Sequence, residues 1–300
     1  MKVIWAVDPF APDRKMQFTT FRILAEFTKA LDSSIEPVAV LTPDQLRVPR
    51  SVFKQKRKAY QLEAETLLES WVRHLDHPRL SKPVLLLQDA FFARPSVDAL
   101  LQYARRKNAG LIGLGTHAKP ALAKLIVGSF AEAMVLKSST PLLLVNPRSR
   151  VLSQIRRILF ATDFSQASRK ALLRLIPIAK KQRAEIIVYY KFDYVIMDTV
   201  AAMRLNPEYS HYLESDLQTK LIAGEHWAQI ARDAGVKASL ILDESPAFVS
   251  EGILKASQKN RTDIIALASR SGPVAAAFLG SVARQVVRSS QRPVWVIHEK

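Results

Sequence analysis

Two segments of the sequence have residues suited to binding phosphate. Gly128-Ser129 and Gly280-Ser281 each precede a predicted helix, and Gly115 ends an apolar run in the first half. The first amide groups of a helix lack intrahelical partners and carry a partial positive charge, so they suit an anion. Glycine allows close approach of the backbone, and serine adds a hydroxyl donor. A Gly-Ser pair alone is equally typical of an ordinary helix start, so other residues must support the site.

Aspartates supply that support, because Asp8 and Asp163 each follow a short apolar run that predicts a first strand. In an open parallel sheet, ligands bind at the carboxyl ends of the strands, where the winding direction reverses. The aspartate, the turns after the second and fourth strands, and the Gly-Ser pair all belong to that edge. The sequence therefore predicts one candidate site in each half.

The elements that must position these residues alternate between short apolar runs and longer amphipathic segments, β-α-β-α-β-α-β-α-β in each half. Strands are expected at 3–7, 37–41, 83–87, 111–114, 141–145, 157–162, 185–190, 236–242, 263–267 and 293–297. Helices are expected at 16–31, 53–75, 96–106, 128–136, 167–180, 207–234, 246–258 and from 280 onward. This alternation is typical of an α/β fold, and the strands show little polar alternation because both faces of a parallel sheet are buried.

The two halves repeat one another. Gly128 precedes Pro141 by 13 residues, and Gly280 precedes Pro293 by 13 residues. A duplicated domain explains the shared order and spacing. We therefore expect one domain at residues 1–146, a second at 156–300, and a polar linker at 147–155.

Composition limits the functional classes. The 300 residues include 44 Lys and Arg, 27 Asp and Glu, and no Cys, which excludes disulfides, thiol nucleophiles and iron–sulfur clusters. The first apolar run is too short for a signal peptide, and no run reaches the roughly 20 residues of a membrane span. We expect a cytoplasmic protein without a membrane partner. The net charge of +17 is spread over both halves and would attract polyanions, but no motif predicts a specific nucleic-acid partner.

A family resemblance follows from these motifs. Gly115-Thr116-His117-Ala118, then nine residues and Gly128-Ser129, resembles the nucleotide motif of the universal stress protein family. Thr162-Asp163-Phe164-Ser165 with Ser168 resembles the first strand and helix of that family. The resemblance implies, in each half, a five-stranded parallel sheet in the order 3-2-1-4-5 with helices on both faces. It also implies pairing of the two domains through their fifth strands.

Some members of that family bind ATP and others do not. In those that bind it, the aspartate contacts the nucleoside, residues after the second strand border the adenine, and the glycine loop holds the phosphates. The implied nucleotide-binding residues are Asp8, Leu41, Gly115, His117, Gly128 and Ser129 in the first half, and Asp163, Arg270, Gly280 and Ser281 in the second. The implied ligand is ATP with Mg²⁺.

Departures from the motif distinguish the halves. Ala118 replaces the second glycine of the first half, whereas Ala268 and Ser271 replace the first two glycines of the second half. Alanine resists the positive φ that glycine adopts readily. The phosphate loop of the first half is therefore closer to the family motif, whereas the turn after the first strand is closer to it in the second half.

The favoured hypothesis is a non-catalytic stress-response regulator with an adenine-nucleotide (ATP) pocket. The pocket of the first domain matches the family motif better than that of the second. One alternative is an adaptor that binds protein or a polyanion through its basic surface without nucleotide. Another is a slow ATPase, although no general base or Mg²⁺-binding carboxylate is evident beyond the two strand-end aspartates. A homodimer is compatible with each hypothesis.

Three further patterns have simpler interpretations. Gly113 to Ala118 fits a relaxed dinucleotide fingerprint, but it follows the fourth strand rather than the first. His74 and His77 lie near a predicted helix end and are interpreted as solvated rather than as metal ligands. Asp243-Glu244 is interpreted as helix-capping charge rather than as a catalytic pair.

Overall fold

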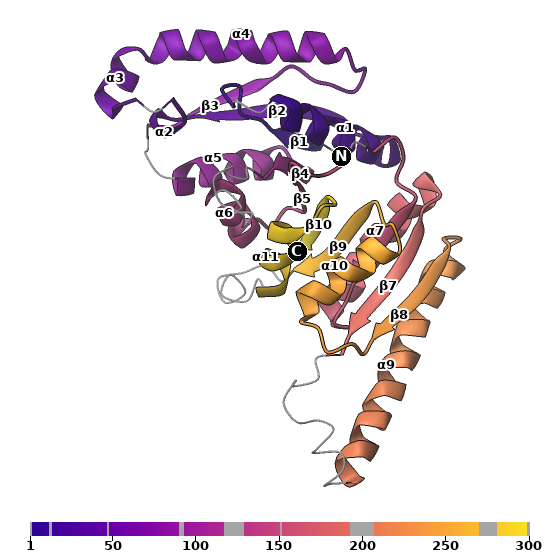
Figure 1. Ribbon diagram of the computed structural model, residues 1–300. Helices are drawn as coiled ribbons and strands as arrows, with labels where there is room; N and C mark the ends of the chain where they lie inside the picture. Colours follow the sequence, from indigo (N-terminus) through magenta and orange to yellow (C-terminus); the bar gives the residue numbers. More distant parts are fainter. Residues whose placement is uncertain are drawn as a thin grey trace. The chain divides into compact units, whose positions relative to one another are not determined.

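The computed structural model describes residues 2–11, 14–46, 48–89, 93–116, 129–150, 152–192, 207–269 and 281–298 (Figure 1). Contacts divide the chain into two compact units. The first unit contains Met1–Gln154 and Ser269–Lys300, and the second contains Ile155–Ala268.

The sheet of the first unit contains β1 (Lys2–Ala6), β2 (Ser34–Leu41), β3 (Val84–Leu87), β4 (Ala109–Gly115) and β5 (Leu142–Val145). These five strands are parallel and lie in the order β3-β2-β1-β4-β5. This is the predicted order 3-2-1-4-5. β10 (Val294–His298) pairs with β5 in the antiparallel direction, with Val294 opposite Leu144.

Helices connect the parallel strands of this unit, because each parallel pair needs a crossover connection. They are α1 (Arg14–Leu31), α2 (Pro43–Leu46), α3 (Arg50–Gln55), α4 (Arg57–Leu75), α5 (Ala93–Arg106) and α6 (Ser129–Lys137). α11 (Ser281–Ser289) instead precedes the antiparallel strand β10. Two glycines of β4 determine how closely α1 packs. A Cβ at Gly113 would lie 2.4 Å from Cδ2 of Leu24, and one at Gly115 would lie 2.7 Å from Cε of Met16.

The single helix predicted over residues 53–75 is wrong, since α3 and α4 are separated at Lys56. Residues seven apart in an unbroken helix are separated by about 10.5 Å along its axis. The rings of Phe53 and Tyr60 instead stack with centroids 6.1 Å apart. Phe53 is fully buried, so packing of these aromatic rings accompanies the break.

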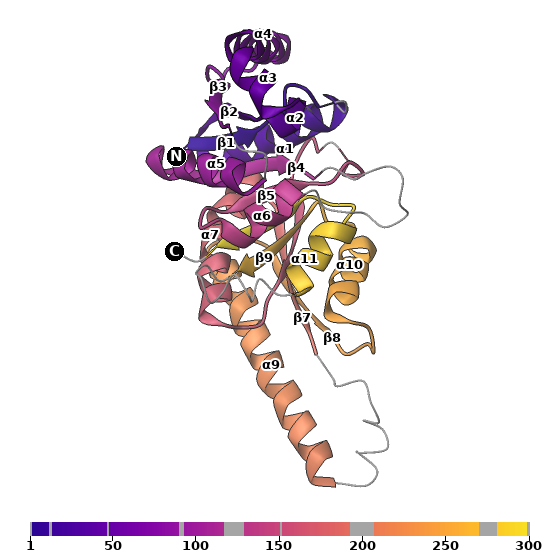
Figure 2. The same ribbon diagram turned by 90° about the vertical axis from the view of Figure 1, so that its left-hand side faces the viewer.

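The second unit has the same strand order as the first four strands of the first unit. β6 (Arg157–Ala161), β7 (Glu185–Lys191), β8 (Ala238–Asp243) and β9 (Ile264–Ser269) are parallel and lie in the order β9-β6-β7-β8. α7 (Gln166–Gln182), α9 (Pro207–Asp233) and α10 (Val249–Lys259) connect them. α9 packs against β7 and β8 and extends beyond these strands (Figure 2).

α9 is the longest helix described, with 27 residues. Within the described part of the chain, no helix combines the length and apolar character needed to cross a membrane.

Candidate functional site

The carboxyl edge of the first sheet brings Asp8 close to the start of the predicted phosphate loop. Ala6 of β1 is paired with Leu114 of β4. Asp8 and Thr116 each lie two residues further along these neighbouring strands, so they follow the same part of the edge. His117 and Gly128 lie outside the described residues, and Ser129 begins α6. The structure therefore brings Asp8 and Gly115 together and leaves the loop itself undescribed.

Hydrogen bonds fix the turn after β1. The backbone amide of Phe10 donates to Oδ1 of Asp8 at 3.0 Å, and the amide of Ala11 donates to the Asp8 carbonyl at 3.2 Å. An aspartate that bonds its own turn in this way holds its side chain in one orientation. Such a carboxylate is suited to accept a hydrogen bond from a sugar hydroxyl.

Leu41 lies at the end of β2 but faces the apolar interior. It is 1% exposed and belongs to a core cluster with Phe53, against which Phe10 packs. The next residue, Thr42, precedes α2. The amide of Gln45 donates to Thr42 Oγ1 at 3.2 Å, and the Thr42 amide donates to Gln45 Oε1 at 3.1 Å. This reciprocal capping box fixes the turn after β2. A contact between Leu41 and adenine remains a prediction.

In the second unit, Asp163 is held by the first turn of α7. Its Oδ1 accepts hydrogen bonds from the Ser165 amide at 2.9 Å and from the Ser168 hydroxyl at 2.6 Å. Ser165 is the N-cap of α7, and its side chain accepts from the Ser168 amide. Burial favours a higher pKa for Asp163, but the hydrogen bonds from Ser165 and Ser168 outweigh it and lower the pKa. Asp163 is therefore ionised at neutral pH. Arg270 and Gly280 lie outside the described residues, and Ser281 begins α11.

An aromatic cluster beside Asp163 was not predicted from the sequence. Phe164 has a φ of 57°, a left-handed conformation that is unusual for a bulky residue. Its ring stacks on Tyr190 at 5.0 Å and meets Trp227 edge-on at 5.2 Å. Lys220 Nζ lies 5.7 Å from the centre of the Tyr190 ring. The available signal was the presence of aromatic residues at the ends of two predicted strands.

A buried polar network at the ends of β7 and β8 was also missed. The Tyr189 hydroxyl donates to Oδ2 of Asp243 at 2.6 Å. Lys191 Nζ donates to the carbonyls of Phe192 at 2.9 Å, Asp243 at 3.3 Å and Ser245. Burial and the hydrogen bond to Asp243 raise the pKa of Tyr189, so Tyr189 remains a donor.

Asp243 has a different role from the one predicted. The N-cap of α10 is Phe248, without a side-chain cap. Burial alone favours a higher pKa for Asp243, but hydrogen bonds from Ser245 and Tyr189 and the charge of Lys191 lower it. The helix-capping interpretation is therefore wrong for Asp243, which instead joins neighbouring strands.

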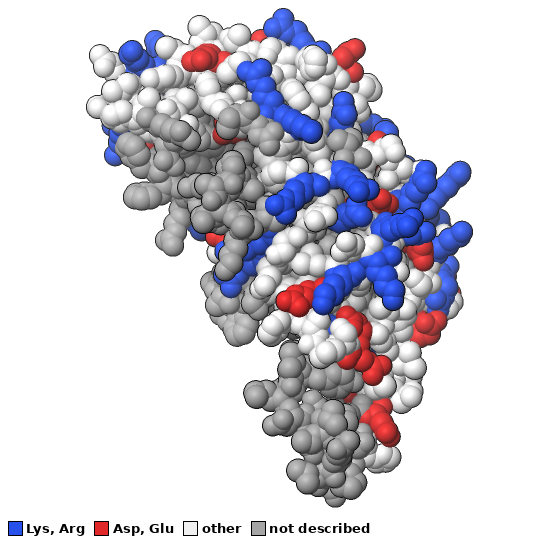
Figure 3. Space-filling model, viewed as in Figure 1, with Lys and Arg blue, Asp and Glu red and all other residues white. Residues whose placement is uncertain are grey.

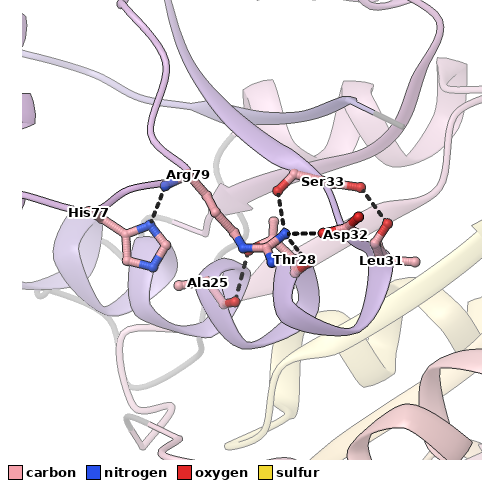
Figure 4. A network of polar contacts seen from close by, with 7 residues as sticks. All are labelled: Ala25, Thr28, Leu31, Asp32, Ser33, His77 and Arg79. Atoms are coloured by element: carbon pink, nitrogen blue, oxygen red, sulfur yellow. Dashed lines mark hydrogen bonds and ion pairs between the residues drawn. The ribbon is translucent and has the colours of Figure 1, made fainter.

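His74 in the last turn of α4 and His77 after it both contact aromatic rings. His74 lies 6.0 Å from Phe18, and His77 meets Phe21 edge-on at 5.4 Å. Nδ1 of His77 accepts a hydrogen bond from the Arg79 amide at 3.3 Å (Figure 4). Burial, followed by the charges of Lys29 and Arg79, lowers the pKa of His77. In the described ranges, no group of three His, Cys, Asp or Glu residues is arranged to hold a metal ion.

Comparison with known proteins agrees with the repeated fold. The universal stress protein family matches residues 1–146 and 154–298. A universal stress protein from Archaeoglobus fulgidus DSM 4304 is similar over 100% of this chain and 98% of its own, with a TM-score of 0.66 and 18% identity. A functionally unknown protein from Pseudomonas aeruginosa PAO1 is similar over 99% of this chain and 92% of its own, with a TM-score of 0.63 and 16% identity. No curated protein sequence matches. Because the family matches twice and covers nearly the whole sequence, this chain belongs to the universal stress protein family and is of the tandem type.

Proposed function

We propose that this protein is a non-catalytic stress-response regulator that binds ATP with Mg²⁺ at the carboxyl edge of its first repeat. The observation that carries the proposal is the position of Asp8. It lies in the turn after β1, is held there by the Phe10 amide, and β1 pairs with β4, which ends at Gly115. The phosphate-loop motif begins at Gly115 and ends where α6 starts. A carboxylate for the sugar and a helix N-terminus for phosphate thus belong to one edge.

The first repeat is the better candidate because of its loop. That loop keeps Gly115 and Gly128 at the family spacing, whereas the second repeat has Ala268 and Ser271 in place of glycines.

The two aspartates provide a matched test by isothermal titration of ATP and Mg²⁺. We expect one binding site in the unmodified protein. Asp8→Ala removes a hydrogen bond to a charged group, which contributes about 1.5–3 kcal/mol, so affinity should fall at least tenfold. Asp163→Ala should leave that affinity unchanged.

Wild-type affinity in Asp8→Ala would refute the proposed pocket, provided that thermal unfolding shows a folded variant. Two sites in the unmodified protein would mean that both loops bind nucleotide. Release of ADP over hours, measured in parallel, would instead support the slow ATPase alternative.

We also propose that the antiparallel pairing of β5 with β10 joins the two repeats, since these are the fifth strands of each repeat in chain order. Val294, Trp295 and Val296 pair with Leu144, Leu143 and Leu142. Trp295 also packs edge-on against Phe27 of α1, with ring centroids 5.3 Å apart. Both observations support a buried association.

A further inference from the structure

The amino edge of the second unit, where β6, β7 and β8 begin and α7 and α10 end, has many cationic side chains. Figure 3 shows Lys and Arg side chains gathered on the right of the view, over this part of the molecule. Six exposed cations have no acidic partner among the residues that the structure describes. These six residues, termed the basic edge, are Lys180, Lys181, Arg183, Lys237, Lys259 and Arg261.

Backbone hydrogen bonds show that these segments are neighbours. The amide of Ile186 donates to the Lys237 carbonyl at 2.8 Å, and the amide of Glu185 donates to the Arg156 carbonyl at 2.8 Å. Adjacent strands are about 4.8 Å apart, so residues that precede them form a row. Lys180 reaches the turn before β8, because a Cβ at Gly235 would lie 3.5 Å from its Nζ. The amide of Asp263 donates to the Arg157 carbonyl at 2.8 Å, so the turn after α10 lies beside the start of β6. The basic edge therefore follows a row of neighbouring strand starts.

Local folding does not require arginine at two of these positions. Arg183 follows α7 with a φ of 54°, and Arg261 follows the end of α10 with a φ of 49°. Helices that end in a left-handed residue favour glycine or asparagine there. Arginine is thus present where a smaller residue would suit the backbone better.

The first repeat serves as an internal comparison. The corresponding residues after α1 and α5 are Asp32 and Asn108, with φ values of 46° and 48°. Asp32 accepts from Arg79 at 3.0 Å, and the same guanidinium nitrogen also lies 3.4 Å from the Thr28 and Ser33 carbonyls (Figure 4). Lys2 is paired with Glu36 at 3.0 Å. The same fold therefore forms without unpaired cations at these two positions.

The basic edge lacks groups that would anchor other kinds of partner. The exposed large apolar side chains in the described residues are Leu62, Leu173, Leu221, Ile222 and Phe248, and none of them belongs to the edge. Protein interfaces and bilayers usually require apolar anchors, and single-stranded nucleic acids require aromatic rings on which bases stack. These side chains therefore favour electrostatic attraction to anionic groups over apolar contact.

We propose that the basic edge of the second repeat binds the phosphate backbone of duplex nucleic acid without sequence preference. Arginine and lysine contact phosphate oxygens, and affinity comes from release of the counterions that surround the duplex. The basic edge belongs to the amino ends of the second unit's strands, whereas the proposed ATP pocket is built from residues of the first repeat, so this interaction does not depend on that pocket.

The test measures binding of the full chain to a fluorescent mixed-sequence DNA duplex over a range of salt concentrations. Arg183→Gly with Arg261→Gly removes two charges and places glycine in left-handed positions, so the variant should remain folded. Lys54→Gln with Lys58→Gln removes two exposed charges from the first unit and is the matched control.

Each lost phosphate contact lowers the slope of log affinity against log salt by about 0.9. The slope should therefore fall by about 2 in the glycine variant, with affinity at 0.1 M salt reduced on the order of fiftyfold. The control should retain its slope. Thermal unfolding at or above the wild-type temperature would confirm that lost binding is not lost folding.

Equal losses in both variants would overturn the proposal, because the attraction would then depend on net charge rather than on this edge. An unchanged slope in the glycine variant would also overturn it. Anionic vesicles or polyglutamate could instead bind as tightly as the duplex, with the same sensitivity to the glycine substitutions. That result would overturn the proposal and identify a membrane or an acidic protein as the partner of the basic edge.

Discussion

Burial of His298 predicts how the stability of this protein depends on pH. His298 lies in β10, is 1% exposed, and has its pKa lowered by burial from 6.5 to about 4. The unfolded chain therefore takes up a proton near pH 6.5, whereas the folded chain resists it until about pH 4. This difference has no effect at high pH and destabilises the fold as pH falls through that window. We expect His298→Gln to remove this dependence.

The size of the effect follows from the two pKa values. One pKa unit corresponds to about 1.4 kcal/mol. Relative to its value at pH 8, the free energy of unfolding of the wild type should fall more than that of His298→Gln. The extra loss should be about 1 kcal/mol at pH 5.5 and about 3 kcal/mol at pH 4.

Urea unfolding at several pH values, followed by tryptophan fluorescence and circular dichroism, measures this difference directly. Asp163 and Asp243 have lowered pKa values, so their stabilisation is lost as pH falls from the ordinary carboxyl pKa of 3.8 to the lowered values. Both proteins contain these aspartates, so the difference between wild type and His298→Gln reports His298 alone. If the free energies of unfolding of the wild type and His298→Gln fell in parallel between pH 7 and pH 4, burial of His298 would not be the cause of the pH dependence.

Two packing predictions can be tested by the same unfolding measurements. Gly113→Ala should destabilise the first unit by about 1–3 kcal/mol, because its Cβ would lie 2.4 Å from Cδ2 of Leu24. The double variant with Leu24→Ala should be destabilised by less than the sum of the two single changes. Additive free-energy changes would contradict this contact. Lys191→Met should destabilise the second unit on the order of 3–5 kcal/mol, because the buried ammonium group bonds three carbonyls; a change below 1 kcal/mol would contradict a structural role for these bonds.

The strands and their parallel pairing could be predicted because they depend on local patterns, whereas the strand order was expected from the family resemblance. Short apolar runs predict buried strands, and their alternation with amphipathic helices predicts parallel pairing. The same patterns predicted both strand-end aspartates and the start of α6 at Ser129. The resemblance also drew attention to the segment from Thr162 to Ser165, but the structure was needed to show that Ser165 caps α7 and that its amide donates to Asp163.

Other features depend on contacts between distant residues. Tyr189 and Asp243 are 54 positions apart, so nothing in the local sequence shows that they bond. The break at Lys56 depends on stacking of Phe53 against Tyr60, which helical periodicity does not show. Gly115 could be predicted to end a strand, but its contact with Met16 of α1 required the folded structure. This contact gives Gly115 a packing role whether or not phosphate binds nearby.

The two repeats show which positions of the fold are free to acquire function. The left-handed residue after the first helix of each repeat is Asp32 in one and Arg183 in the other, with φ values of 46° and 54°. The backbone conformation is retained while the charge is reversed, so the fold specifies the angle and leaves the side chain to another use. A basic side chain at a helix end complements the helix dipole in either repeat. The dipole therefore does not explain why Asp32 is neutralised by Arg79 whereas Arg183 has no acidic partner among the described residues. Binding of the proposed duplex at Arg183 would account for this difference.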